Sequence, residues 1–259
     1  MHLNTDINVI ASIPDFELLF RALELAANDN YKRDLKDLII GNNVFNLRTE
    51  YSKVRFVTVA KTSYLKFQND DHKVLITSLF RCEGLGSIKQ LVLFWQLAIN
   101  NKLFFLITKD VFLKLYFQGR IGIPKDELLA YLKYLAESYP EIKSWSASTH
   151  ERIASKYLTF MKRIGLLEGS QKKVFRYIRT DTPSFVYFIY LAKAVYPEVR
   201  NIFDTPLFDF CLMSQESFMD WVRQIKLMEY FNITTDGNKI LIELKVNFED
   251  IVNVLSNRT

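Results

Sequence analysis

The stretch WSASTHERIASKYLTFMKRIGLLEG, from Trp145 to Gly169, carries the strongest structural signal in the chain. Its apolar residues recur every three or four positions, which is the spacing of one face of an α-helix. At about 100° of rotation per residue, five of them fall within about 100° of one another. They are Ile153, Tyr157, Phe160, Met161 and Ile164. This stripe predicts a helix that buries one face against a protein core.

Signals for both ends of this helix flank the stripe. Ser148 is followed three residues later by Glu151, the spacing of a capping box in which each side chain bonds the other residue's backbone amide. Gly165 or Gly169 can end the helix, because glycine readily takes the backbone conformation that follows a last helical turn. We therefore predict a helix over residues 148–164 that begins at Ser148.

The opposite face of the predicted helix carries hydroxyl and basic side chains, with Glu151 at its margin. These residues are Arg152, Ser155, Lys156, Thr159, Lys162 and Arg163. The helix is followed by KKVFRYIR (residues 172–179), whose β-branched and aromatic residues are typical of a short strand. A helix followed by a small basic hairpin, or wing, is the expected local structure.

The net positive charge of the protein is concentrated in this segment. The chain has 34 Lys and Arg against 29 Asp and Glu, a formal net charge of +5. Residues 144–180 contain 8 basic and 2 acidic residues, a balance of +6, so the rest of the chain has 26 basic and 27 acidic residues and a balance of −1. The segment therefore differs in charge from the rest of the protein.

A basic helix beside a basic hairpin is typical of a nucleic-acid-binding protein. Lys and Arg neutralise phosphates, Ser and Thr hydroxyls bond phosphate oxygens, and a helix N-terminus adds backbone amides. In winged-helix geometry the N-terminal half of the helix would enter the major groove of duplex DNA. The candidate DNA-binding residues are Ser148, Thr149, Arg152, Ser155, Lys156, Thr159, Lys162, Arg163, Lys172, Lys173 and Arg176. A basic face that is simply solvated is the alternative at this point.

The remaining sequence predicts a mainly α protein. Helical periodicity dominates residues 1–140, which we expect to form a helical domain. We assign residues 141–183 to a winged-helix-like basic module. Residues 184–259 are expected to form a helical module with a β-hairpin, because FNITTDGNKILIELK contains the turn signal Asp236-Gly237 between two strand-like runs.

No catalytic, metal or cofactor site is predicted. The histidines His2, His72 and His150 are scattered, so no triad or zinc ligand set can be assigned. Cys82 and Cys211 lie far apart in apolar surroundings, which predicts two buried free thiols. We therefore expect a binding protein that is not an enzyme and that uses no cofactor.

Targeting and membrane signals are also not predicted. The N-terminus lacks a basic region followed by an apolar core, and the apolar stretch over residues 91–117 is interrupted by charged and amide side chains. The free thiols fit a reducing compartment. The expected location is the cytoplasm, with no membrane partner.

The order of several segments resembles a known family. These segments are NNVFNLRTEYSKVRFVTVAKTSYLKF (42–67), LGSIKQLVLFWQLAINNKLFFLITKDVFLKLYF (85–117), the stretch 145–169 and TPSFVYFIYLAKAV (182–195). Together they resemble the BrxA family of bacterial BREX phage-exclusion systems. The resemblance implies a small, non-enzymatic, helical protein of a defence locus, similar in fold to NusB-type antitermination factors and linked to DNA binding. It maps the motif helix to Ser148, Thr149, Arg152 and the basic residues that follow, and it supplies no catalytic residues.

The leading hypothesis is therefore an accessory factor of a BREX system that binds double-stranded DNA through helix 148–164 and its wing. One alternative is a protein-interaction scaffold whose basic face docks an acidic patch on another BREX protein. A second is an RNA-binding, NusB-like factor, which the expected core positions of Tyr157 and Phe160 disfavour because RNA readers stack bases on exposed aromatics. The sequence leaves the oligomeric state and any DNA sequence preference open.

Overall fold

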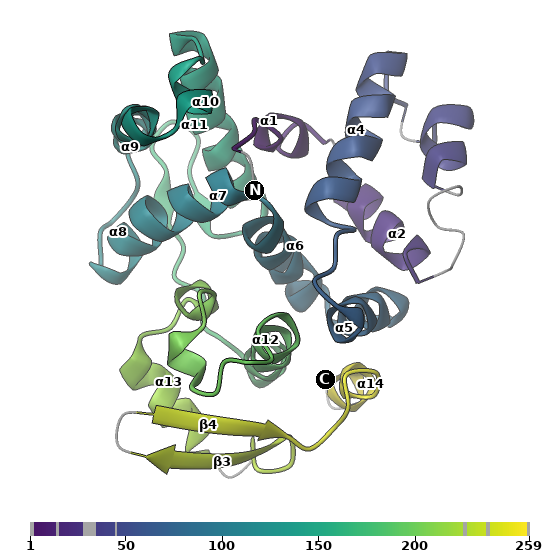
Figure 1. The fold of residues 1–259 in the computed structure, drawn as a ribbon, viewed down its shortest axis with the longest axis vertical. Helices are drawn as coiled ribbons and strands as arrows, with labels where there is room; N and C mark the ends of the chain where they lie inside the picture. The colour runs from purple at the N-terminus through teal and green to yellow at the C-terminus, as the bar shows by residue number, and fades with distance from the viewer. Residues whose placement is uncertain are drawn as a thin grey trace. The chain divides into compact units, whose positions relative to one another are not determined.

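The computed structural model describes residues 3–13, 16–27, 35–44, 46–224, 227–236 and 239–257 (Figure 1). Contacts within the chain group it into two compact units. Unit 1 comprises Met1–Lys66 and Leu93–Ile178, and unit 2 comprises Phe67–Val92 and Arg179–Thr259. Each unit therefore combines segments that are distant in the sequence. The division into modules at residues 140 and 183 stays a prediction.

Unit 1 is built from helices and one small hairpin. Its helices begin with α1 (Ile7–Ile10), α2 (Glu17–Leu25), the π-helical turn η1 (Asp37–Gly41) and α4 (Glu50–Ser63). They continue with the end of α6 (Gly86–Asn100), α7 (Lys102–Ile107), the π-helical turn η2 (Thr108–Leu113), α8 (Lys114–Phe117), α9 (Lys125–Ser138), α10 (Pro140–Lys143) and α11 (Ala147–Arg163). The hairpin pairs β1 (Leu167–Glu168) with β2 (Val174–Phe175).

A polar residue separates α6 from α7. The Asn101 side chain caps α7 by accepting a hydrogen bond from the Phe104 amide at 2.9 Å. The chain bends by 108° between α6 and the run Lys102–Phe117. Within that run the π-helical turn η2 places Thr108 in the core, where its side chain is fully buried.

Unit 2 contains the other elements of the fold. They are α5 (Asp70–Arg81), the start of α6, α12 (Thr182–Val195), the 3-10 turns η3 (Ile202–Asp204) and η4 (Phe208–Cys211), α13 (Gln215–Val222), β3 (Phe231–Asp236), β4 (Lys239–Leu244) and α14 (Ile251–Ser256). Helix α12 lies at the centre of this core, because nearly all its side chains are buried. Its Tyr187 hydroxyl donates to the Leu75 carbonyl of α5 at 3.2 Å, and its Tyr190 hydroxyl bonds the Val246 backbone after β4.

The predicted fold class is confirmed, because the described residues are mainly helical and form two antiparallel two-stranded sheets. The C-terminal hairpin is also confirmed, with Phe231 paired to Leu244 and Asp236 to Lys239. The predicted turn residue Gly237 lies outside the described residues.

The prediction of two buried thiols is correct for only one cysteine. Both are free, but Cys82 is partly exposed, because it directly follows the last turn of α5. Cys211 is buried, and burial raises the pKa of its thiol to about 12.

Within the described ranges, no single helix is long and apolar enough to cross a membrane. Helix α6 and the run Lys102–Phe117 reach the required length and hydropathy only when they are taken together.

Candidate nucleic-acid interface

Helix α11 is anchored in unit 1 by its apolar face, packing on α1 and α9. Ile153, Tyr157, Phe160 and Met161 are fully buried. The Tyr157 hydroxyl donates to Thr108 Oγ1 of η2 at 3.1 Å, so its polar end also has a partner in the core. The predicted buried stripe is thus confirmed.

The start of α11 differs from the prediction. Ser146, not Ser148, is the capping residue, and its Oγ accepts a hydrogen bond from the Thr149 amide at 3.3 Å. The prediction of a capping box between Ser148 and Glu151 is wrong. Ser148 lies inside the helix, and the Glu151 carboxylate forms an ion pair with Lys125 of α9. Both serines precede the apolar stripe, so the sequence pattern did not separate them.

This correction predicts different stability effects for the two serines. We expect Ser146→Ala to lower the free energy of unfolding by about 1 kcal/mol, because one amide of the first turn loses its acceptor. We expect Ser148→Ala to change the stability by less than about 0.5 kcal/mol, since this exposed serine caps nothing. Equilibrium urea denaturation measures both values. A larger loss for Ser148→Ala would contradict the assigned cap.

The hairpin after α11 is short and is held from its outer side. Leu167 pairs with Phe175 and Glu168 with Val174. The segment before α9 extends this pairing, because the Ile123 amide donates to the Lys173 carbonyl at 3.0 Å and the Phe175 amide to the Ile121 carbonyl at 2.9 Å. The free edge of β2 is therefore fixed to the segment before α9.

Two glycines permit this geometry. Gly169, the first residue of the hairpin loop, has a φ of +85°, a conformation that other residues rarely adopt. Gly122 lies so close to β2 that a Cβ atom there would meet the Lys173 carbonyl oxygen at 2.2 Å. A side chain at Gly122 would therefore separate the hairpin from the segment that supports it.

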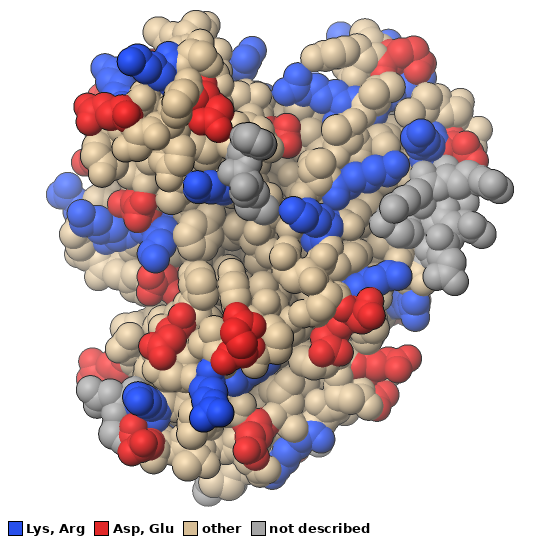
Figure 2. Space-filling model, viewed as in Figure 1, with Lys and Arg blue, Asp and Glu red and all other residues tan. Residues whose placement is uncertain are grey.

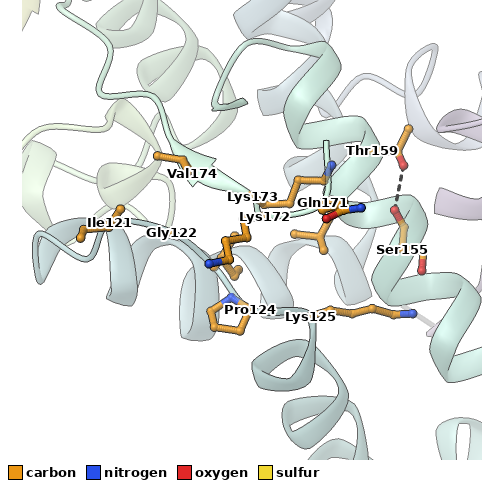
Figure 3. A pocket seen from close by; sticks show the side chains of 12 residues that line it. Ile121, Gly122, Pro124, Lys125, Ser155, Thr159, Gln171, Lys172, Lys173 and Val174 are labelled. Carbon is orange, nitrogen blue, oxygen red and sulfur yellow. Dashed lines mark hydrogen bonds between the residues drawn. The ribbon is translucent and has the colours of Figure 1, made fainter. Parts of the chain in front are cut away.

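An open hollow of about 650 Å³ lies between α11, the hairpin loop and the segment before α9 (Figure 3). Ser155 and Thr159 of α11 line one end, and Ile121 and Val174 lie at the other. The lysines that line it are Lys125, Lys172 and Lys173. The hollow therefore offers hydroxyl and ammonium groups side by side, a combination that suits phosphate oxygens.

The structure brings some of the predicted site residues together. Ser155, Thr159, Lys172 and Lys173 share the hollow. Ser148 and Thr149 lie in the first turn of α11. Arg152, Lys162 and Arg176 are exposed, and Lys156 is partly exposed. Within the described part of the chain, no carboxylate forms an ion pair with Arg152, Lys156, Lys162, Lys172 or Arg176.

Two lysines at the hollow already have partners. Lys173 Nζ donates to the carbonyls of Gly169 and Ser170, which closes the hairpin loop. Lys125 forms an ion pair with Glu151, so it neutralises one of the two acidic residues in residues 144–180. Lys125 and Gln171 also line the hollow, although they were not among the residues predicted from the sequence. No local pattern indicates that Lys125 would face a helix that follows it by more than twenty residues.

Arg163 is set apart from the other predicted site residues. Its guanidinium donates to the Ile13 carbonyl and lies 4.4 Å from the centre of the Phe16 ring, so it fastens the N-terminal segment to α11. It also lies near the buried Tyr64, where burial raises the pKa of the hydroxyl and the positive charge of Arg163 opposes that rise. The structure therefore places Arg163 in the packing of unit 1.

The two units differ in charge. By sequence, unit 1 has 23 Lys and Arg against 15 Asp and Glu, a balance of +8, and unit 2 has 11 against 14, a balance of −3. In the view of Figure 2, Lys and Arg predominate over α4, and both signs of charge are present around α9–α11. The excess of positive charge thus belongs to the unit that contains α11 and the hairpin.

The fold and this surface define a mainly helical protein whose cationic helix is joined to a small, fixed hairpin. A family model described as BrxA matches residues 19–182. The chain belongs to the BrxA family, as the resemblance predicted, and this membership implies a role in BREX phage defence. The match includes α11 and the hairpin. No curated protein matches the chain in a sequence comparison.

Proposed function

We propose that this protein is a non-enzymatic accessory factor of a BREX system that binds double-stranded DNA through α11 and the β1–β2 hairpin. Two observations support the proposal. Five cationic side chains of α11 and the hairpin segment form no ion pair with a described carboxylate, and one of them, Lys172, lines a hollow together with the hydroxyl groups of Ser155 and Thr159. Such a surface can neutralise several adjacent phosphates of a duplex.

The helix and the hairpin have complementary roles in this proposal. Arg152 and Lys156 on α11 contact phosphates on one side of the bound groove, while Lys172 in the hairpin loop contacts the backbone on the other. Ser155 and Thr159 bond phosphate oxygens between them. This is a winged-helix-like mode of binding, in which affinity comes mainly from the DNA backbone and only weakly from the base sequence.

Arg163 is left out of the contact set, although the sequence pattern included it. Its guanidinium is engaged by Ile13 and Phe16, so a substitution there would perturb packing and confuse the test. The variant that isolates the proposed surface is Arg152→Ala/Lys156→Ala/Lys172→Ala. All three side chains reach solvent.

We expect this triple variant to bind a random-sequence duplex on the order of tenfold to a hundredfold more weakly than the wild type, because three phosphate contacts are lost. Fluorescence anisotropy with a labelled duplex measures the affinity. The matched control is Arg48→Ala/Lys66→Ala/Lys133→Ala, which removes three exposed positive charges elsewhere in unit 1 and should change the affinity by less than about threefold.

The outcomes separate the proposal from its main alternative. Equal weakening in both triple variants would mean that net charge alone attracts the DNA. No binding by the wild type would make the basic surface a docking site for an acidic protein of the same system. In that case a partner that co-purifies with the wild type after nuclease treatment should be lost from the Arg152/Lys156/Lys172 variant.

A further inference from the structure

Large apolar side chains are exposed beside the hairpin. Phe117, at the end of α8, is 42% exposed, Ile121 is 82% exposed, and Tyr177, shortly after β2, is 53% exposed. Exposed apolar groups that gather next to a charged surface are typical of a binding site. Ile121 also lines the hollow that contains Ser155, Thr159 and Lys172.

The fold fixes one of these residues through its backbone and another through its side chain. The backbone of Ile121 is fixed to β2, because its carbonyl accepts the Phe175 amide at 2.9 Å. The Tyr177 hydroxyl donates to the Arg120 carbonyl at 2.8 Å, and its ring lies 4.7 Å from the ring of Tyr116. The backbone at Ile121 and the ring of Tyr177 therefore have little conformational freedom left to lose when a ligand covers them.

The charges around this edge indicate the chemistry of the ligand. Arg120 and Arg176, each adjacent in sequence to Ile121 or Tyr177, are exposed and form no ion pair with any described carboxylate. A suitable ligand has anionic groups on its surface, which the arginines can bind. It also has apolar groups close enough behind that surface for the Ile121 side chain to contact them. Duplex DNA fits this description, because its stacked bases lie behind its phosphates.

We propose that Ile121, supported by Tyr177, is a wedge that enters the minor groove and unstacks a base step next to the phosphates bound by α11. Apolar side chains that are inserted in this way open a step and bend the duplex. The inference rests on the proposed DNA-binding function and adds to it that the protein deforms the DNA it binds. The arginines beside Ile121 would hold the two strands on either side of the opened step.

The test uses the whole protein and two short duplexes. One is fully paired, and the other differs from it only by a single mismatch at the central step. Each carries 2-aminopurine beside that step. The fluorescence of 2-aminopurine rises when it is unstacked. We expect the wild type to increase the fluorescence and to bind the mismatched duplex about tenfold more tightly, because a mismatched step costs less to open.

The variants assign this effect to one side chain. Ile121→Ala should lose the fluorescence rise and the mismatch preference, while Ile121→Leu should keep both. Val54→Ala, at an exposed apolar position on α4, should behave as the wild type. Because Ile121 is exposed, its substitution should leave folding intact, and circular dichroism checks this.

Two results would overturn the wedge in different ways. If the wild type binds both duplexes equally without a change in fluorescence, or if Ile121→Ala keeps the full response, the wedge is wrong while the proposed DNA binding stands. If the wild type binds neither duplex, the proposed function itself fails, and the wedge fails with it.

Discussion

Replacing Phe160 with alanine is expected to lower the free energy of unfolding by about 3–5 kcal/mol, the usual cost of removing a buried aromatic ring. Phe160 is fully buried on the apolar face of α11. Its ring meets those of Phe104, from α7, and Phe16 edge-on, with centroids at 5.4 and 5.9 Å. The substitution would therefore open a cavity where α11 is anchored.

The neighbouring residue provides a matched control in the same helix. Thr159 is exposed, and its hydroxyl donates only to the Ser155 carbonyl one turn earlier. We expect Thr159→Ala to change the stability by less than about 0.5 kcal/mol. Urea denaturation of both variants measures the difference. Similar losses for the two substitutions would contradict the assignment of the buried face of α11.

Replacing Gly122 with valine is expected to destabilise unit 1 by about 3 kcal/mol, because the strain falls on backbone atoms that cannot rotate away. The first added carbon would meet the Lys173 carbonyl oxygen at 2.2 Å and Val174 Cα at 3.3 Å. Relieving this overlap breaks the hydrogen bonds of Ile123 and Phe175 that hold the hairpin. The variant should therefore also bind DNA more weakly, since Lys172 loses its fixed position.

Hydrogen exchange at the amides of Ile123 and Phe175 reports this local change, and both should exchange faster in the Gly122→Val protein. The control is Gly86→Ala. Gly86 is the first residue of α6, has no left-handed conformation, and has open space around the added carbon. It should be neutral or slightly stabilising. Unchanged protection at both amides in Gly122→Val would show that the hairpin does not depend on this close approach.

Local periodicity predicted α11 well, because one helix face must be buried whatever it packs against. It failed at the helix start, where Ser146 and Ser148 are both suitable caps and the choice depends on where the chain enters from α10. The partner of Glu151 is Lys125, from a different helix. A local motif therefore could not distinguish a capping glutamate from one that forms an ion pair across elements.

The predicted basic face shows the same limit. Arg163 falls on the polar side by rotation, at about 20° from Lys156. The fold, however, brings Ile13 and Phe16 to it from 150 and 147 residues earlier in the chain. The support of the hairpin by residues 121–123 is likewise a contact between distant segments. Periodicity identifies which residues leave the core, whereas tertiary packing decides which of them stay free to bind.

The salt dependence of DNA affinity tests the proposed interface most directly. Each phosphate contact releases counterions, so the logarithm of the association constant falls linearly with the logarithm of salt concentration, and loss of one contact reduces the slope by about 1. We predict a steep slope for the wild type and a slope smaller by about 3 for Arg152→Ala/Lys156→Ala/Lys172→Ala. Identical slopes for the two proteins, or wild-type binding that does not respond to salt, would contradict DNA recognition by α11 and its hairpin.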